Sequence, residues 1–243
     1  MTLSAKAFQR WLQGIAPDAS TADVCRVSGI KRTTLAQQLV RGKVSVSTVV
    51  SISRAYNINP VAALAGFDAY SALAGPPRPP TRSELVSQIA TGDILQALLA
   101  RQAMDAAGGA AAPALGPAPH ATSVKNWVDA IDDGEVRHRV SASTGVAPQN
   151  YSAQLTANRL SPELAVATAL AAGVGPAGGL VATGVITEDE AGWAPGARQA
   201  ALDSLTDGEL TTLAGERLQA LGKVLRRQEQ DQAQTEKIWE NLG

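Results

Sequence analysis

The sequence predicts an all-α fold in which two similar helical bundles stand in tandem, each followed by helical extensions. Two observations lead to this fold class: apolar residues recur at the spacing of one helix face, and the chain repeats itself after 116 residues. Aromatic residues make up only 4% of the chain, so the cores must be built mainly from Ala, Val, Leu and Ile. With 243 residues, the chain is long enough for two domains.

The internal repeat needs no gap. Shifting residues 11–64 by 116 positions gives 11 identities in 54 positions. An alanine-rich background does not explain Trp, Gly and Pro residues that recur at a fixed offset, so we expect a duplicated unit. The identical pairs include Trp11 and Trp127, Gly29 and Gly145, Gln38 and Gln154, Ser45 and Ser161, and Pro60 and Pro176.

The first unit begins with a helix from about Ser4 to Ile15, whose apolar face carries Phe8, Trp11 and Leu12. The next two helices are short. Their bounds and those of the following helices rest on cap and turn residues.

Thr21 is a suitable N-cap for the second helix, and Gly29 provides a sharp turn after it. The third helix starts near residue 31, buries Leu35 and Leu39, and can end in a left-handed cap at Gly42.

Two further helices complete this unit. Ser45 or Ser47 caps the fourth, and Asn59 with Pro60 forms the N-cap and first position of the fifth.

Capping boxes open the extensions that follow each unit, Thr81 with Glu84 and Thr206 with Glu209. For the last helix we favour an ordinary core face over a dimer surface; its leucines are Leu210, Leu213, Leu218, Leu221 and Leu225. The predicted division of the chain is therefore a first domain (1–75), a Pro-rich connector with helical extension (76–105), a flexible Ala/Gly/Pro linker (106–123), a second domain (124–190) and an acidic helical segment (191–243).

The second and third helices, joined by a glycine turn, have the form of a helix-turn-helix. The outward face of the third helix carries Arg32, Thr33 and Gln37, side chains of the types that reach base edges. The expected phosphate contacts are Arg26, Lys31, Arg41 and Lys43.

An ungapped series of glycine, apolar and cap residues links Val24, Gly29, Leu35, Gly42, Ser45 and Pro60. With this spacing, residues 5–66 resemble the DNA-binding domain of phage lambda repressor and Cro-type regulators, the Xre class. The resemblance implies a small helical bundle whose third helix is the recognition helix. With its Ala- and Gly-rich composition and this domain type, the chain resembles the immunity repressors of actinobacterial phages and prophages.

The second unit keeps the spacing but changes the chemistry, since Lys31 and Arg32 become Ala147 and Pro148. The candidates for base contacts here are Gln149, Asn150 and Gln154, and Arg159 is the candidate phosphate contact. Two interpretations stay open: a second DNA reader with a different sequence preference, or a degenerate copy kept for packing or protein contacts.

Charge is distributed unevenly although the formal net charge is only −1. Residues 1–110 carry 11 Lys and Arg against 6 Asp and Glu, whereas residues 181–243 carry 6 against 11. This asymmetry favours a localised phosphate-binding face in the N-terminal half. Together with the helix-turn-helix resemblance, it implies double-stranded DNA as the partner.

Catalytic and metal chemistry is not expected. Two widely separated histidines and the lone Cys25, a core residue, give no zinc ligand set, and we identify no phosphate loop or catalytic triad. The predictions are therefore no enzyme activity, no metal, no cofactor and no small-molecule ligand.

A protein without disulfides and without a visible signal peptide suits the cytoplasm of a bacterial or phage-infected cell. The uncharged stretch from Leu164 to Thr187 is rich in Gly, so we expect two short helices there and no membrane contact.

These observations predict a transcription regulator that acts by occupying its operator, and the resemblance implies a phage or prophage immunity repressor. It would bind a long, non-palindromic site as a monomer through both units, and an oligomer is possible but not required. The alternatives are a protein-interaction adaptor built from degenerate repeats and a DNA-organising or partition protein.

Overall fold

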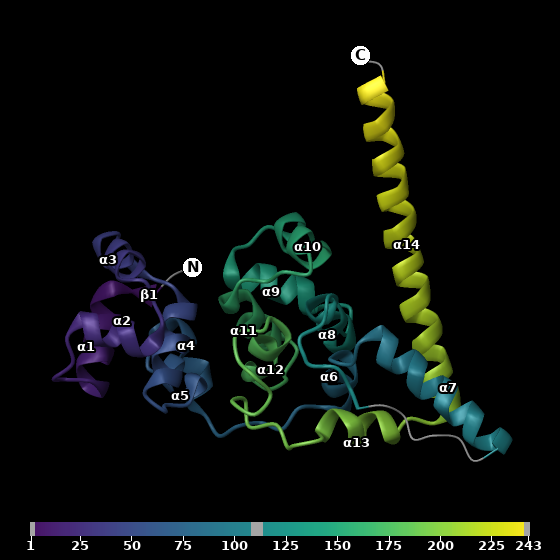
Figure 1. The fold of residues 1–243 in the computed structure, drawn as a ribbon, viewed down its shortest axis with the longest axis horizontal. Coiled ribbons are helices and arrows are strands. Elements are labelled where there is room, and N and C mark those ends of the chain that lie inside the picture. Colours follow the sequence, from purple (N-terminus) through teal and green to yellow (C-terminus); the bar gives the residue numbers. More distant parts are fainter. Residues whose placement is uncertain (1–2, 108–113, 241–243) are drawn as a thin grey trace. The chain divides into compact units, whose positions relative to one another are not determined.

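A computed structural model describes residues 3–107 and 114–240 (Figure 1). The chain is 67% helix and 2% strand, which confirms the predicted helical class. By contacts it divides into two compact units, and each is described separately below. Unit 1 comprises residues 1–88 and 117–198, and unit 2 comprises residues 89–116 and 199–243.

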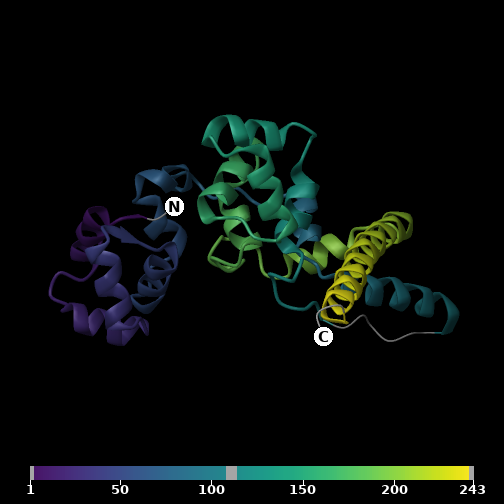
Figure 2. The same cartoon turned by 90° about the horizontal axis from the view of Figure 1, so that it is seen from above.

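Within unit 1, residues 3–74 form a group of helices that we call the first bundle (Figure 2, purple and blue). Its α-helices are α1 (Ala5–Ile15), α2 (Thr21–Ser28), α3 (Arg32–Val40), α4 (Val46–Ala55) and α5 (Pro60–Ala65), followed by the 3-10 helix η1 (Asp68–Ala74). The core contains fully buried Phe8, Val24, Leu35, Ile52 and Leu64.

Local signals set most of these bounds. Ser45 caps α4 by accepting a hydrogen bond from the Thr48 amide, and Asn59 caps α5 ahead of Pro60, as predicted. The cap of α2 lies one residue earlier than predicted: the Ser20 hydroxyl, not that of Thr21, accepts from the Asp23 amide.

A small pair of strands departs from a purely helical fold. Strands β1 (Leu3–Ser4) and β2 (Lys43–Val44) pair antiparallel, with Leu3 opposite Val44. Gly42 just before β2 has a φ of 70°, the left-handed conformation predicted for it. The pairing fixes the segment after α3 against the start of the chain, and so positions Lys43.

The helices α6 (Arg82–Ser87), α8 (Ser123–Ile131), α9 (Val136–Thr144), α10 (Pro148–Thr156), α11 (Pro162–Ala171) and α12 (Pro176–Ala182) form the second bundle, also in unit 1. A shift of 116 residues maps the bounds of α3 and α4 onto those of α10 and α11. The left-handed residues also correspond, Gly29 with Gly145 and Gly42 with Asn158. The uncharged stretch from Leu164 to Thr187 is divided into α11 and α12.

Helix α6 belongs to the core of the second bundle, although the sequence placed it in an extension of the first domain. Its Glu84 is buried; it closes the predicted capping box with Thr81, and its Oε1 accepts a hydrogen bond from Trp127 Nε1 at 3.2 Å. Gly178 and Gly179 of α12 leave room for this arrangement, since a Cβ on Gly179 would lie 2.9 Å from the Trp127 ring. The second bundle is therefore completed by residues from before the predicted linker.

Direct contacts join the two halves of unit 1. The Arg54 guanidinium of α4 binds the Glu190 carboxylate at 2.6 and 2.7 Å, and Asn59 Nδ2 donates to the Glu190 carbonyl at 2.9 Å. Ile186 and Trp193 lie in the same apolar cluster as the first bundle's Leu73. The two halves are thus not connected by a linker alone.

Part of the predicted linker, residues 108–113, lies outside the described residues, and residues 114–123 make specific contacts. Gly116 donates its amide to Asp93 at 3.0 Å in unit 2. In unit 1, His120 Nε2 lies 3.0 Å from the Ser87 carbonyl oxygen and its amide donates to the Ser123 hydroxyl. This described part is therefore held in place, in contrast to the flexible coil predicted.

Unit 2 holds α7 (Thr91–Ala107), most of α13 (Ala197–Asp203) and α14 (Asp207–Glu240). Figures 1 and 2 show α14 as one long rod with α7 beside its first turns, where Ile94, Leu202 and Leu210 are buried together. Further along α14 the predicted core leucines are 45–47% exposed, namely Leu218, Leu221 and Leu225. The buried face of this helix therefore ends near Ala214.

Within residues 3–107 and 114–240, none of the helices combines the length and the apolar character that crossing a bilayer would require.

Candidate nucleic-acid interface

The turn between α2 and α3 orients the candidate reading helix. Gly29 ends α2 with a φ of 71°, and Lys31 then adopts an extended conformation as the N-cap of α3. Leu35 is fully buried and anchors α3 on the core. The opposite face of α3 is consequently turned to solvent.

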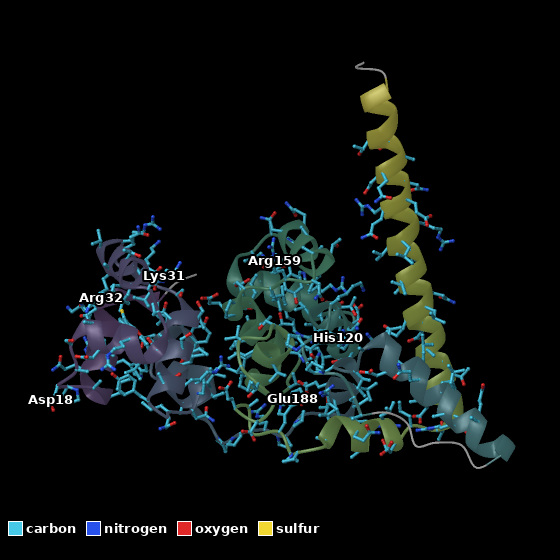
Figure 3. The ribbon with its side chains drawn as sticks, in the orientation of Figure 1. Asp18, Lys31, Arg32, His120, Arg159 and Glu188 are labelled. Atoms are coloured by element: carbon cyan, nitrogen blue, oxygen red, sulfur yellow. The ribbon has the colours of Figure 1, made fainter. Side chains whose placement is uncertain are left out.

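The three candidate base-contacting residues of the first bundle, Arg32, Thr33 and Gln37, are all exposed on α3. Arg32 and Lys31 lie at the start of the helix (Figure 3). The exposed polar groups of Arg32, Thr33 and Gln37 are available to an external partner, and Thr33 and Gln37 lie on the side of the helix away from Leu35.

The candidate phosphate contacts of the first bundle are also exposed. Among the described residues, Lys31, Arg41 and Lys43 have no acidic side chain within ion-pair distance, nor does Arg32. Arg26 alone is paired, with Asp23 at 3.1 Å. The pKa of Asp23 is held below its ordinary value first by the Ser20 hydroxyl and then by Arg26.

A residue that sequence reasoning missed, Gln38, fixes α3 against α4. Its Oε1 accepts hydrogen bonds from the Ser45 amide and the Thr48 hydroxyl, both at 3.0 Å. The signal was present, because Gln38 and Gln154 are identical in the repeat. A glutamine at this position in both bundles points to a shared positioning role.

In the second bundle, Pro148 occupies the first turn of α10, and Gln149 and Asn150 are exposed beside it. Gln154 differs from them. It is half-buried, and its Oε1 accepts a hydrogen bond from the Ser161 amide at 3.3 Å, the same contact that Gln38 makes. The structure therefore gives Gln154, predicted to contact bases, an internal positioning role.

The cations of α9 are paired with acidic residues. Arg137 binds Asp129 at 2.9 Å and Asp132 at 2.8 Å, and Arg139 binds Asp133 at 2.9 Å. The hydrogen bond from Arg139 is the main cause that lowers the pKa of Asp133 below its ordinary value. These three aspartates neutralise the arginines next to them.

Arg159, the candidate phosphate contact of this bundle, follows α10 and is exposed (Figure 3). Its backbone amide donates to the Gln154 carbonyl, while its side chain has no ion pair among the described residues. It is the second bundle's counterpart of Lys43.

No group of three or more His, Cys, Asp or Glu side chains suited to a metal ion occurs in the part of the chain that the structure describes. Cys25 is buried in the core of the first bundle.

Comparison with known proteins gives no relative: no family model, curated protein or solved structure matches the chain. The functional argument therefore rests on the residues of this chain.

Proposed function

We propose that the chain is a sequence-specific regulator that binds double-stranded DNA through the first bundle, with α2 and α3 acting as a helix-turn-helix. The observation that carries this proposal is the exposed surface of α3, where Thr33 and Gln37 lie near Lys31, Arg32, Arg41 and Lys43, four cations with no acidic partner among the described residues. A cluster of this kind attracts polyanions and offers donors suited to base edges.

In the proposed mechanism, α3 lies in the major groove. Arg32 donates two hydrogen bonds to the O6 and N7 atoms of a guanine, while Thr33 and Gln37 contact neighbouring bases. Lys31, Arg41 and Lys43 bind phosphates and so fix the register of the helix on the duplex. Gln38 supports this geometry, because it holds α3 to the start of α4.

The biological role that fits is repression by occupancy, in which the bound protein excludes RNA polymerase from a promoter. This role follows the resemblance of residues 5–66 to lambda-repressor-type regulators and to phage and prophage immunity repressors. The site of action is then the interior of a bacterial or phage-infected cell.

We propose the second bundle as a tandem copy that reads DNA weakly through Gln149 and Asn150. Its paired arginines leave little free positive charge, so the affinity of this bundle alone is low. Attachment to the first bundle raises the effective concentration of the second contact.

The same neutralised surface favours a rival function, in which the chain is an adaptor that binds proteins. Selection of bound sequences from a random duplex pool, followed by footprinting of the strongest site, separates the two. A specific footprint that weakens steeply with salt supports the regulator. If the purified protein retains no duplex even at low salt, the regulator proposal is wrong and the adaptor is favoured.

A further inference from the structure

Val40, in the last turn of α3, is a hydrophobic residue in an unusual place. Its exposed fraction is 88%, whereas the other exposed large hydrophobic residues of the described chain range from 45% to 65%. Exposure of one valine is common in itself. Its position is informative, because Val40 is the large hydrophobic residue exposed on the helix that carries the candidate base contacts.

Val40 shares the outward face of α3 with the candidate base contacts. Thr33, Gln37 and Val40 follow one another at spacings of four and three residues, which places them on one side of the helix. The buried Leu35 lies on the opposite side. A partner that contacts Thr33 and Gln37 therefore also meets the two methyl groups of Val40.

The second bundle has a related residue at the equivalent position. Thr156 follows Val40 by 116 residues, is exposed, and has nearly the same shape with one methyl group. Its hydroxyl donates to the Ser152 carbonyl at 3.0 Å, which leaves the methyl group as its outward apolar part. Both bundles thus present a β-branched side chain with a methyl group at the end of the equivalent helix.

We propose that Val40 reads the C5-methyl group of a thymine in the major groove. This inference rests on the proposed function and assigns a specificity role to a residue outside the hydrogen-bonding set. The thymine methyl is the apolar feature that base pairs display in that groove, and aliphatic side chains discriminate it by contact. Val40 lies about 12 Å along the helix axis from Arg32, so the thymine is a different base pair from the guanine that Arg32 contacts.

The test uses the strongest selected duplex, in which each thymidine in turn is replaced by deoxyuridine, which lacks only the methyl group. For the wild-type protein, one replacement should weaken binding about fourfold, the factor that corresponds to about 0.8 kcal/mol for one buried methyl group. For Val40→Ala, that same replacement should cause no further loss, because the contact is already absent. Val40→Thr should retain part of the discrimination.

The matched control is Val27→Ala, which truncates a 49% exposed valine on α2. It should leave the sensitivity to every thymine replacement unchanged. Equal sensitivity of the wild type and Val40→Ala at all thymines, on a duplex that both bind specifically, overturns this inference and leaves the proposed function standing. If the wild type binds no duplex, both proposals are wrong.

Discussion

Helices α3 and α4 of the first bundle have the same bounds, shifted by 116 residues, as α10 and α11 of the second, but the two bundles differ in surface charge. Around α3, four cations are exposed without acidic partners in the described chain, whereas Arg137 and Arg139 beside α10 are bound to aspartates. At the positions equivalent to Asp129, Asp132 and Asp133, the first bundle has Gln13, Ala16 and Pro17. The difference teaches that equivalent helices can carry either an anion-attracting or a neutralised face, because the second bundle lacks the counterparts of Lys31, Arg32 and Arg41 and has aspartates in and after α8.

The bundles also differ in how their tryptophans are packed. Trp127 is fully buried against Glu84 and the two glycines of α12. The equivalent Trp11 is only partly buried and packs against Phe8 and Phe67, with ring centroids 5.8 and 6.0 Å apart. The second bundle thus depends on α6 in a way that has no counterpart in the first.

The largest expected effect follows from this contrast. Trp127→Ala should destabilise the second bundle by about 3–5 kcal/mol, the usual cost of truncating a fully buried large aromatic residue. Trp11→Ala should cost clearly less, since part of that side chain already meets water. Denaturant-dependent amide hydrogen exchange in α8–α12 and in α1–α5 measures the two losses separately. Equal losses would show that the contacts with α6 do not distinguish the bundles.

The next effect concerns base reading. Arg32→Ala should weaken binding to the selected site by about 1–3 kcal/mol and relax the preference at one base pair. Arg137→Ala is the control in the second bundle and should change affinity little, because that guanidinium is bound to two aspartates. Competition binding with single-base variants of the site gives both numbers. An equal loss on specific and random duplexes would reduce Arg32 to a phosphate contact.

Phosphate contacts give a smaller, sequence-independent effect. Lys43→Ala should weaken all duplexes alike and reduce the slope of log affinity against log salt by about one. Arg159→Ala removes the corresponding exposed cation of the second bundle. A similar change of slope for Arg159→Ala would place the second bundle on DNA, and an unchanged slope would make it an assembly or packing module.

Sequence reasoning succeeded where the signal was local. Ser45 and Asn59 cap the helices that their sequence context indicated, and the box of Thr81 and Glu84 forms as predicted. A cap is a contact within one turn, so three or four residues of sequence contain it.

The failures concern partners that are distant along the chain. Glu84 was recognised as a cap, but its bond to Trp127, 43 residues away, was not predictable from a capping motif. Likewise, the ion pair of Arg137 with Asp132 forms only because the folded loop after α8 brings the two side chains together. The candidate site of the first bundle was easier to predict from the sequence, because its residues lie on one short helix and the segments beside it.

The partly exposed ion pair of Arg54 and Glu190 should contribute at most about 1 kcal/mol to the free energy of unfolding, and this contribution should depend on pH. The hydrogen bonds from Arg54 are the main cause that lowers the pKa of Glu190 below its ordinary value near 4.5. A depressed pKa in the folded state means that the stabilisation is present above the unfolded-state pKa and is lost as pH falls through the folded-state value.

Glu190→Gln should therefore lower the free energy of unfolding at pH 6 and have little effect near pH 3. Urea unfolding of the wild type and of this variant at both pH values checks the sign. A difference that grows toward low pH would contradict the assignment of Arg54 as the stabilising partner.

The smallest expected effect on DNA affinity comes from the exposed residues of α10. It bears most directly on the comparison between the bundles. Asn150→Ala removes a side chain that can pair with adenine, from a bundle with little free positive charge. Because the first bundle supplies most of the affinity and holds the second near the duplex, we expect a loss of less than about 1 kcal/mol. Gln154→Ala differs, since it should lower the stability of the second bundle by removing the bond to Ser161.

The symmetry of the DNA site tests, without any mutation, whether both bundles contact DNA. Both bundles lie in one chain in the same order, so binding needs no two-fold axis, unlike the palindromic sites of dimeric regulators. A monomer should occupy a long non-palindromic site. Scrambling the half under α3 should then abolish binding, while scrambling the half under α10 should cost as little as Asn150→Ala. A short palindrome bound by two chains, with protection limited to two copies of the first bundle, would show that the second bundle does not read DNA.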